Sequence, residues 1–284
     1  NEERKFYFEA DVNVDNKTGK AYSKKTGEEL AVKVEKMSKS KNNGVDPEVI
    51  VKEYGADSAR VFSLFAAPPE KELEWNMNGL AGAYRFLNRL FLLIEDTKEF
   101  SEAGEIDHGK RNNEDSEIQK KLHQTVKKVS ESMEDNFHFN TAIAALMELL
   151  NDMTTYRQKV IDTGNISSES KKIWREVMEK TVLMLSPFAP HIADELWTAS
   201  GRDGYAFLEN WPEYIEELTK ESKINLVVQV NGKLRDTILA DVNMPKEELE
   251  KIALASEKAQ KFTEGKEVVK VVVVPNKLVN IVVK

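Results

Sequence analysis

The pattern of hydrophobic and polar positions changes twice along the chain. In the first segment, apolar and polar residues alternate at Phe6–Phe8 and Ala31–Val34. Turn-forming segments separate these runs at Asp15–Lys20 and Lys25–Glu28. Alternation with a period of two between such turns predicts short antiparallel strands. The first segment is therefore expected to be rich in short strands, and its pattern assigns no role to residues 1–33.

The middle of the chain has the period of helices. Asp46 and Pro47 predict a helix start, because Asp caps free backbone N–H groups and Pro needs no donor in the first turn. Between Gly79 and Glu99, apolar residues recur every three or four positions, as on a helix with one buried face. Helices are predicted at Pro47–Tyr54, from Asp57 to the Pro68-Pro69 pair, and at Gly79–Glu99, Ser116–Met133, Asn140–Thr163, Ser168–Leu185 and His191–Ser200. The last five of these, from Gly79 to Ser200, together predict a helix bundle.

Strand-forming residues return near the carboxyl terminus, beyond a segment rich in Gly, Pro and Glu. Asn231-Gly232 supplies the positive backbone angles of a tight hairpin turn between two apolar runs. β-branched residues dominate two further runs around Pro275-Asn276. The predicted order is strands at Asn225–Val230 and Lys233–Ala240, helices at Pro245–Ala255 and Ser256–Phe262, and strands at Val268–Val274 and Lys277–Val283. This order indicates a small α+β domain.

A chain of 284 residues is long enough for more than one core. The predicted fold class is a multidomain, mainly α protein with a short β-rich N-terminal segment, a helix bundle and a small C-terminal α+β domain. The predicted domains are residues 1–78, 79–200 and 224–284, with a linker at 201–223. The chain begins at Asn1 and not at Met, as expected for a piece of a longer natural product, although processing of the N-terminus explains this start equally well.

Composition narrows the candidate chemistry. The chain has no Cys, which excludes disulfides, thiolate nucleophiles and sulfur-bound zinc. Its four His residues lack short metal-ligand spacing, so no metal site is expected. No apolar run approaches the roughly 20 residues that span a bilayer, so we expect a cytoplasmic protein without membrane contact. The net charge is −8, but the acidic excess lies in the middle of the chain, and the mildly basic ends could contact phosphate.

One basic segment has the composition of a phosphate-contacting loop. Lys36-Met37-Ser38-Lys39-Ser40 is followed by Lys41 and the flexible run Asn42-Asn43-Gly44. Lys ammonium groups and small hydroxyls can bind phosphate oxygens, and such a loop is free to close. Composition alone also fits an ordinary solvated loop, which most Lys/Ser runs form. Walker, Gly-x-Ser-x-Gly and His-Glu-x-x-His motifs are absent from the sequence.

The order of residues in this loop resembles the second signature of the class I aminoacyl-tRNA synthetases. The following Gly44–Pro47 and Tyr54–Arg60 resemble the subgroup that uses aliphatic amino acids. In this family the loop contacts the phosphates of ATP and helps to stabilise the leaving pyrophosphate. The resemblance implies that two lysines, Lys36 and above all Lys39, act in catalysis by supplying positive charge to ATP. The implied ATP-binding residues are Lys36, Met37, Ser38, Lys39 and Ser40.

Two later segments, Pro68–Trp75 and Arg85–Arg89, resemble the leucyl enzymes of this family. At the end of the predicted bundle, Ser186–Trp197 resembles the last helices of the tRNA-binding bundle in the aliphatic subgroup. Trp75 is itself expected to be a core anchor, and His191 is expected to be structural. In the family, the bundle contacts the tRNA without reading the leucine anticodon.

The end of the chain resembles the terminal domain of bacterial leucyl enzymes, at Val228–Arg235 and Lys277–Val283. In the family, this domain is flexibly attached and touches the outer corner of the L-shaped tRNA. Lys233 and Arg235 are our candidates for RNA contact, although simple solvent-facing charge explains them equally well. Without an aromatic stacking pattern, contacts to RNA shape and backbone are expected instead of base readout.

The resemblance implies the C-terminal part of a leucyl-tRNA synthetase, which joins leucine to tRNA(Leu) through leucyl-adenylate. ATP, Mg²⁺, leucine and tRNA(Leu) are the implied cofactors and partners, and a monomer is expected. The His-Ile-Gly-His type signature of the nucleotide-binding half is absent, so the chain alone is expected to be inactive. Two alternatives stay open: a non-catalytic module or split-synthetase subunit that binds tRNA by shape, and a helical scaffold.

Overall fold

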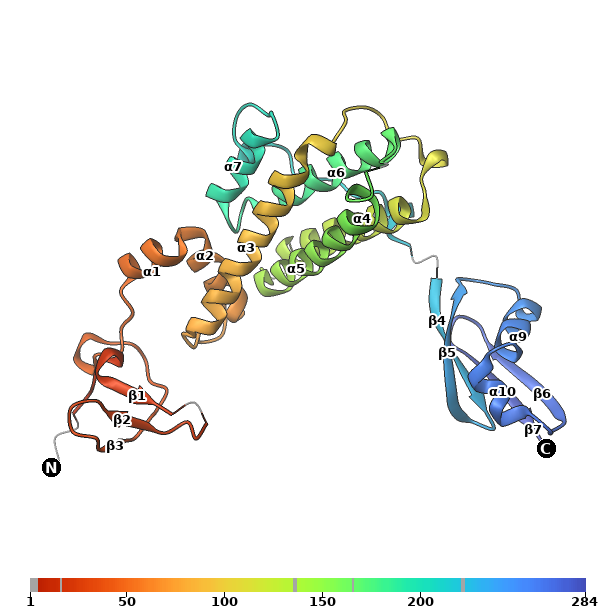
Figure 1. The fold of residues 1–284 in the computed structure, drawn as a ribbon, viewed down its shortest axis with the longest axis horizontal. Coiled ribbons are helices and arrows are strands. Elements are labelled where there is room, and N and C mark those ends of the chain that lie inside the picture. Colours follow the sequence, from red (N-terminus) through yellow and green to blue (C-terminus); the bar gives the residue numbers. More distant parts are fainter. Residues whose placement is uncertain (1–4, 16, 135–136, 165, 221–222) are drawn as a thin grey trace. The chain divides into compact units, whose positions relative to one another are not determined.

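The computed structural model describes residues 5–15, 17–134, 137–164, 166–220 and 223–284. The chain forms two compact units, Asn1–Leu218 and Thr219–Lys284 (Figure 1). Parts of three predicted features, the first domain (residues 1–4), the first turn (residue 16) and the linker (residues 221–222), lie outside the described residues. The mainly helical, multidomain fold class is confirmed.

A small antiparallel sheet begins the first unit, after a short 3₁₀ turn at Glu9–Asp11. Its strands are β1 (Val12–Val14), β2 (Ala21–Ser23) and β3 (Glu29–Leu30), in the order β1-β2-β3. The predicted turns connect these strands, but the strands predicted at Phe6–Phe8 and Ala31–Val34 are wrong. Val32 and Val34 are 69% and 75% exposed. Alternation alone does not make a strand where no neighbouring strand offers hydrogen bonds.

Seven helices follow in the order that their apolar periods predict. They are α1 (Pro47–Tyr54), α2 (Ala56–Ala66), α3 (Met77–Thr97), α4 (Asn113–Glu134), α5 (Phe139–Tyr156), α6 (Ser168–Leu185) and α7 (Pro190–Ala199). Asp46 caps α1 as predicted, because its side chain accepts a 2.9 Å hydrogen bond from the Glu48 N–H. In the segment predicted as one helix at Asn140–Thr163, the α-helix ends at Tyr156, and residues Arg157–Ile161 form a π-helical turn.

One apolar core unites these helices, and each large buried side chain contributes about 1.5–3 kcal/mol. The largest fully buried side chains in it are Trp174, Phe62, Phe188, Leu80, Leu87, Leu90, Ile94, Leu122, Ile143, Leu146, Leu149 and Leu150. A series of hydrogen-bonded polar side chains lies in the same interior. Asp115, fully buried, accepts hydrogen bonds from the Tyr156 hydroxyl at 2.6 Å and from Ser170 Oγ at 3.0 Å. Burial and the neighbouring Asp115 raise the pKa of Tyr156 above its ordinary value, so its hydroxyl keeps the proton that it donates.

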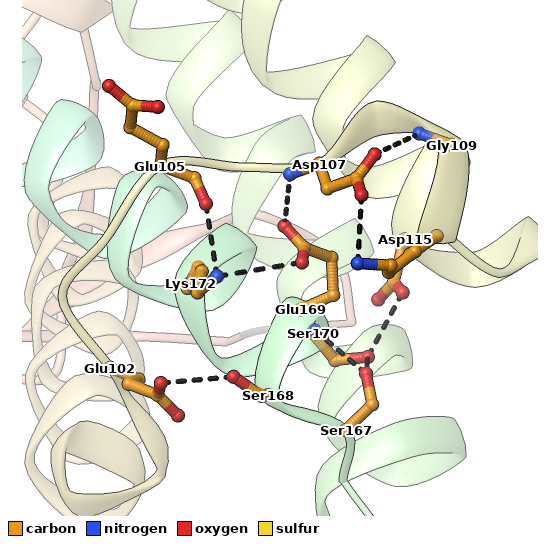
Figure 2. Close-up of polar contacts among 11 residues, drawn as sticks. Glu102, Glu105, Asp107, Gly109, Asp115, Ser167, Ser168, Glu169, Ser170 and Lys172 are labelled. Carbon is orange, nitrogen blue, oxygen red and sulfur yellow. Dashed lines mark hydrogen bonds and ion pairs between the residues drawn. The ribbon is translucent and has the colours of Figure 1, made fainter.

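The connection between α3 and α4 is anchored to the start of α6 (Figure 2). It contains 3₁₀ turns at Lys98–Phe100 and His108–Lys110. Glu169 Oε1 accepts a 2.6 Å hydrogen bond from the Asp107 N–H, and Lys172 Nζ donates to the Glu105 carbonyl at 3.1 Å. Side chains of α6 therefore satisfy the Asp107 N–H and the Glu105 carbonyl in a polar segment that the sequence predicts to be a loop.

Most of the predicted linker packs against the helices. It contains a 3₁₀ turn at Ala206–Leu208 and the short α8 at Glu216–Thr219. Trp211 Nε1 donates to Ser130 Oγ at 2.8 Å, and the Ile215 N–H donates to the fully buried His123 Nδ1 at 3.1 Å. The first unit consequently extends to Leu218, which leaves only the last residues of the predicted linker outside it.

The second unit is a four-stranded sheet with two helices. Its elements are β4 (Lys223–Val230), β5 (Lys233–Asp241), α9 (Lys246–Leu254), α10 (Glu257–Thr263), β6 (Val268–Val274) and β7 (Leu278–Val283). The sheet order is β5-β4-β7-β6, with β4 and β7 parallel. Its core contains Leu226, Val228 and Ile281, all fully buried. The predicted hairpin turn is confirmed, because Asn231 and Gly232 have φ of 48° and 75°.

Candidate functional site

The Lys36–Ser40 loop lies directly before α1. Residues 36–38 have no regular secondary structure, and Lys39–Lys41 forms a single 3₁₀ turn. Asn42 ends this turn with φ of 53°, and its N–H donates to the Lys39 carbonyl at 3.3 Å. Asn accepts such a left-handed conformation more readily than most residues. The loop is thus a defined turn on the surface, followed by a capped helix.

The structure distinguishes the two lysines of this loop from Lys41, which follows it. The half-buried Lys41 forms an ion pair with Glu35. Lys36 and Lys39 are exposed, and neither has an ion-pair partner within the described part of the chain. The resemblance pointed to Lys36 and Lys39, but the sequence did not reveal the Lys41–Glu35 pair, because a spacing of six residues brings two side chains together only where the backbone turns. Two ammonium groups are therefore available for an anionic ligand, whereas the third is neutralised.

Polar groups beside the free lysines suit phosphate oxygens. Ser38 Oγ and Ser40 Oγ lie 3.3 Å apart, and Met37 is 44% exposed between the two lysines. Hydroxyls and ammonium groups donate hydrogen bonds to phosphate without themselves having to gain or lose a proton. This arrangement can stabilise negative charge on a phosphate chain, which is electrostatic catalysis and not acid–base catalysis.

Two of the family-like segments meet in the first unit. Asp57, on α2, accepts a 2.8 Å hydrogen bond from the Ile192 N–H at the start of α7. His191 Nδ1 lies 2.9 Å from the same carboxyl group, although the His191 side chain is 72% exposed. Asp57 therefore caps α7 from another helix, and it gives His191 the structural position that the sequence predicted.

Trp75 also has a structural position. Its ring meets Phe62 edge to face, with centroids 5.1 Å apart and planes at 80°. Its Nε1 lies 3.3 Å from the sulfur of Met77. These contacts attach the segment between α2 and α3 to the main core, as expected for an aromatic anchor.

The two candidate RNA-contacting residues differ in accessibility. Lys233 is exposed at the start of β5. Arg235 is half-buried, and its guanidinium lies 3.6 Å from the ring centroid of Phe262 on α10. The register shift between β4 and β5 opposite Val228 and Gln229 leaves Arg235 without a paired residue, as at a β-bulge. The hairpin therefore presents Lys233 more freely than Arg235, a difference that their neighbouring positions in the sequence did not reveal.

Comparison with protein families supports the motif-based resemblance. A family described as "tRNA synthetases class I (I, L, M and V)" matches residues 27–76, which include the loop. A family described as "Anticodon-binding domain of tRNA ligase" matches residues 115–253, from α4 into the second unit. Among the described residues, no helix is both long enough and apolar enough to cross a membrane.

Comparison with individual proteins is more specific. The chain is 51% identical to a leucine–tRNA ligase of Fusobacterium nucleatum over 270 residues, which cover 94% of this chain and 31% of that protein. It is 44% identical to a leucine–tRNA ligase of Brachyspira hyodysenteriae over 286 residues, which cover 99% of this chain and 32% of that protein. The chain thus spans about a third of the length of these relatives.

A solved structure extends the similarity to the fold. In the ternary complex of Agrobacterium radiobacter K84 agnB2 LeuRS with tRNA and LeuAMS, the synthetase chain matches with a TM-score of 0.67 and 33% identity, over 87% of this chain and 31% of that chain. Sequence identity, family matches and fold agree with the motifs read from the sequence. The chain belongs to the leucine–tRNA ligase family of class I tRNA synthetases, as a C-terminal portion of such an enzyme.

Proposed function

We propose that this chain is the part of a leucine–tRNA ligase that supplies an ATP-contacting loop and tRNA-binding surfaces. The complete protein would attach leucine to tRNA(Leu) through leucyl-adenylate, with ATP as a substrate. The observation that carries this proposal is a pair of exposed lysines in the signature loop, for which the described residues offer no ion-pair partner, next to a third lysine neutralised by Glu35.

In this proposal Lys36 and Lys39 hold the phosphate chain of ATP, and Lys39 contributes most. Adenylate formation places additional negative charge on the departing pyrophosphate, and fixed cations lower the free energy of that transition state. Ser38 and Ser40 donate hydrogen bonds to phosphate oxygens, and Met37 shapes the loop against the nucleotide. Mg²⁺ would arrive with the nucleotide, because it is usually bound through substrate phosphates. The amino-acid site and the first nucleotide-binding signature would come from outside this chain, which alone would be inactive.

We further propose that the helices α3–α7 and the second unit bind tRNA(Leu). The proposed tRNA-binding regions keep the boundaries 79–200 and 224–284, and residues 1–78 would complete the catalytic domain. Lys233 would contact the RNA backbone, with Arg235 in a supporting position over Phe262. We propose a monomer, and the proposed activity belongs in the cytoplasm.

The test is leucine-dependent ATP–pyrophosphate exchange by a full-length version of the protein. Lys39→Ala should slow exchange by on the order of 100-fold, as expected for a lost transition-state contact, without changing affinity for tRNA(Leu). The matched control is Lys33→Ala, which removes an exposed lysine just outside the loop and should leave exchange unchanged. Normal exchange by Lys39→Ala would instead favour a tRNA-binding module without catalytic contact.

A further inference from the structure

We propose that Asn43 is a positioning residue that holds the Lys36–Ser40 loop in shape. Asn43 lies outside the five-residue signature, between this loop and α1 in the sequence, and its side chain is half-buried. The effect on catalysis rests on the function proposed above, whereas the effect on loop structure does not. Asn43 is not placed in contact with ATP.

One side chain spans the beginning and the middle of the loop. Asn43 Oδ1 accepts a 2.8 Å hydrogen bond from the Ser38 N–H. Asn43 Nδ2 donates to the carbonyls of Glu35 and Lys36, each at 3.3 Å. The backbone on both sides of Met37 is therefore tied to a single planar amide group.

The partners fix the orientation of this amide. A backbone N–H can only donate and a carbonyl can only accept, so the oxygen must face Ser38 and the nitrogen must face Glu35 and Lys36. An Asp carboxylate could keep the bond to Ser38 but would face two carbonyl oxygens without a proton to offer. An Ala side chain would lose all three contacts. Asn meets the whole set with one short side chain.

The hydrogen bonds of Asn43 hold the backbone at and beside the lysines of the proposed ATP contact. The three backbone partners of Asn43 belong to Lys36 itself and to Glu35 and Ser38 on either side, and Ser38 is followed by Lys39. Glu35 is held a second time, through its ion pair with Lys41. A loop held in this way has less conformational freedom to lose when a phosphate chain binds, so its cations act with a smaller entropic cost.

Limited trypsin digestion of the present chain tests the structural part directly. Trypsin cleaves after Lys, and Lys36 and Lys39 lie in the loop, with Lys41 directly after it. Asn43→Ala should increase cleavage at these sites about tenfold, because it removes all three hydrogen bonds that hold the loop backbone. Val34→Ala is the control, because it removes a side chain that is 75% exposed just before the loop, changes no lysine and should leave cleavage unchanged. Equal cleavage of Asn43→Ala and the unmodified chain would overturn the proposal.

Exchange kinetics in a full-length version test the catalytic part. Asn43→Ala should lower kcat/KM for ATP about tenfold and leave KM for leucine unchanged, and Asn43→Asp should be more impaired than Asn43→Ala. Equal losses for ATP and leucine, or normal exchange by Asn43→Ala beside a defective Lys39→Ala, would refute a positioning role in catalysis. Normal exchange by Lys39→Ala would refute the proposed function itself, and the digestion result would then decide the role of Asn43 in the loop.

Discussion

Asp57 caps a helix to which it does not belong: its buried carboxyl group accepts a 2.8 Å hydrogen bond from the Ile192 N–H in the first turn of α7. Residue Ala189, which precedes α7, provides no side-chain cap. The cap therefore joins two segments that lie 135 positions apart in sequence, and it attaches α7 to α2 as well as satisfying its backbone.

Removing this cap should destabilise the first unit. Asp57→Ala is expected to lower its free energy of unfolding by about 1–2 kcal/mol, the usual effect of losing a helix cap. Asp57→Asn keeps an acceptor for Ile192 and should lose less. His191→Ala should change stability by less than about 0.5 kcal/mol, because the side chain is 72% exposed. Urea unfolding followed by tryptophan fluorescence measures this unit alone, since all four Trp residues precede Thr219. A larger loss from His191→Ala than from Asp57→Ala would contradict this account.

The series of buried polar side chains in the bundle gives a second prediction. Tyr156→Phe removes the hydroxyl that donates to the fully buried Asp115 at 2.6 Å. The free energy of unfolding should fall by about 1–3 kcal/mol, because Asp115 loses a donor that water cannot replace. Tyr84→Phe is the matched control, since Tyr84 is 40% exposed, and it should have little effect. Equal urea midpoints for the two variants would show that the Asp115–Tyr156 bond contributes no net stability.

Glu176 should make the first unit sensitive to acid. Burial raises the pKa of Glu176, but the contacts with His123, Lys180 and Gln119 outweigh burial and lower this pKa to about 2. A carboxyl group with a lowered pKa in the folded state stabilises the protein above its ordinary pKa of 4.5 and loses that contribution as pH falls toward about 2. The lowered pKa of Glu176 contributes at most about 3 kcal/mol to the free energy of unfolding at pH 7.

The measurement is urea unfolding of the unmodified chain and Glu176→Gln between pH 7 and pH 3. The unmodified chain should lose more stability than the variant over this interval, and the difference between them should be largest at pH 7. Parallel pH profiles would show that the titration of Glu176 is not coupled to folding.

Lys233 should contribute to tRNA affinity through phosphate contact. Lys233→Ala should weaken binding of tRNA(Leu) by the present chain and reduce the slope of log K against log salt by about 0.7–0.9, the value for one lost phosphate contact. Lys270→Ala removes another exposed lysine of the second unit and serves as the control. An unchanged salt slope for Lys233→Ala would exclude this residue from the RNA interface.

Local sequence determined most of the secondary structure of this protein. Apolar residues every three or four positions predicted the five bundle helices between Gly79 and Ser200, because burial of one helical face is encoded at that period. Asp46, Pro47 and Asn231-Gly232 marked a helix start and a hairpin turn, because caps and positive φ depend on residues adjacent in the chain. The order of residues in Lys36–Ser40 likewise indicated the family.

Only the tertiary structure decided which of these local features meet. In the folded chain, β4 pairs with β7, and Asp57 accepts a hydrogen bond from Ile192. The predicted linker packs against His123, and Ala31–Val34 forms no strand. The tertiary structure also separated Lys41 from the free lysines and placed Asn43 across the loop. These relationships depend on distances between residues that are not neighbours in a helix or strand, and local periodicity contains no information about such distances.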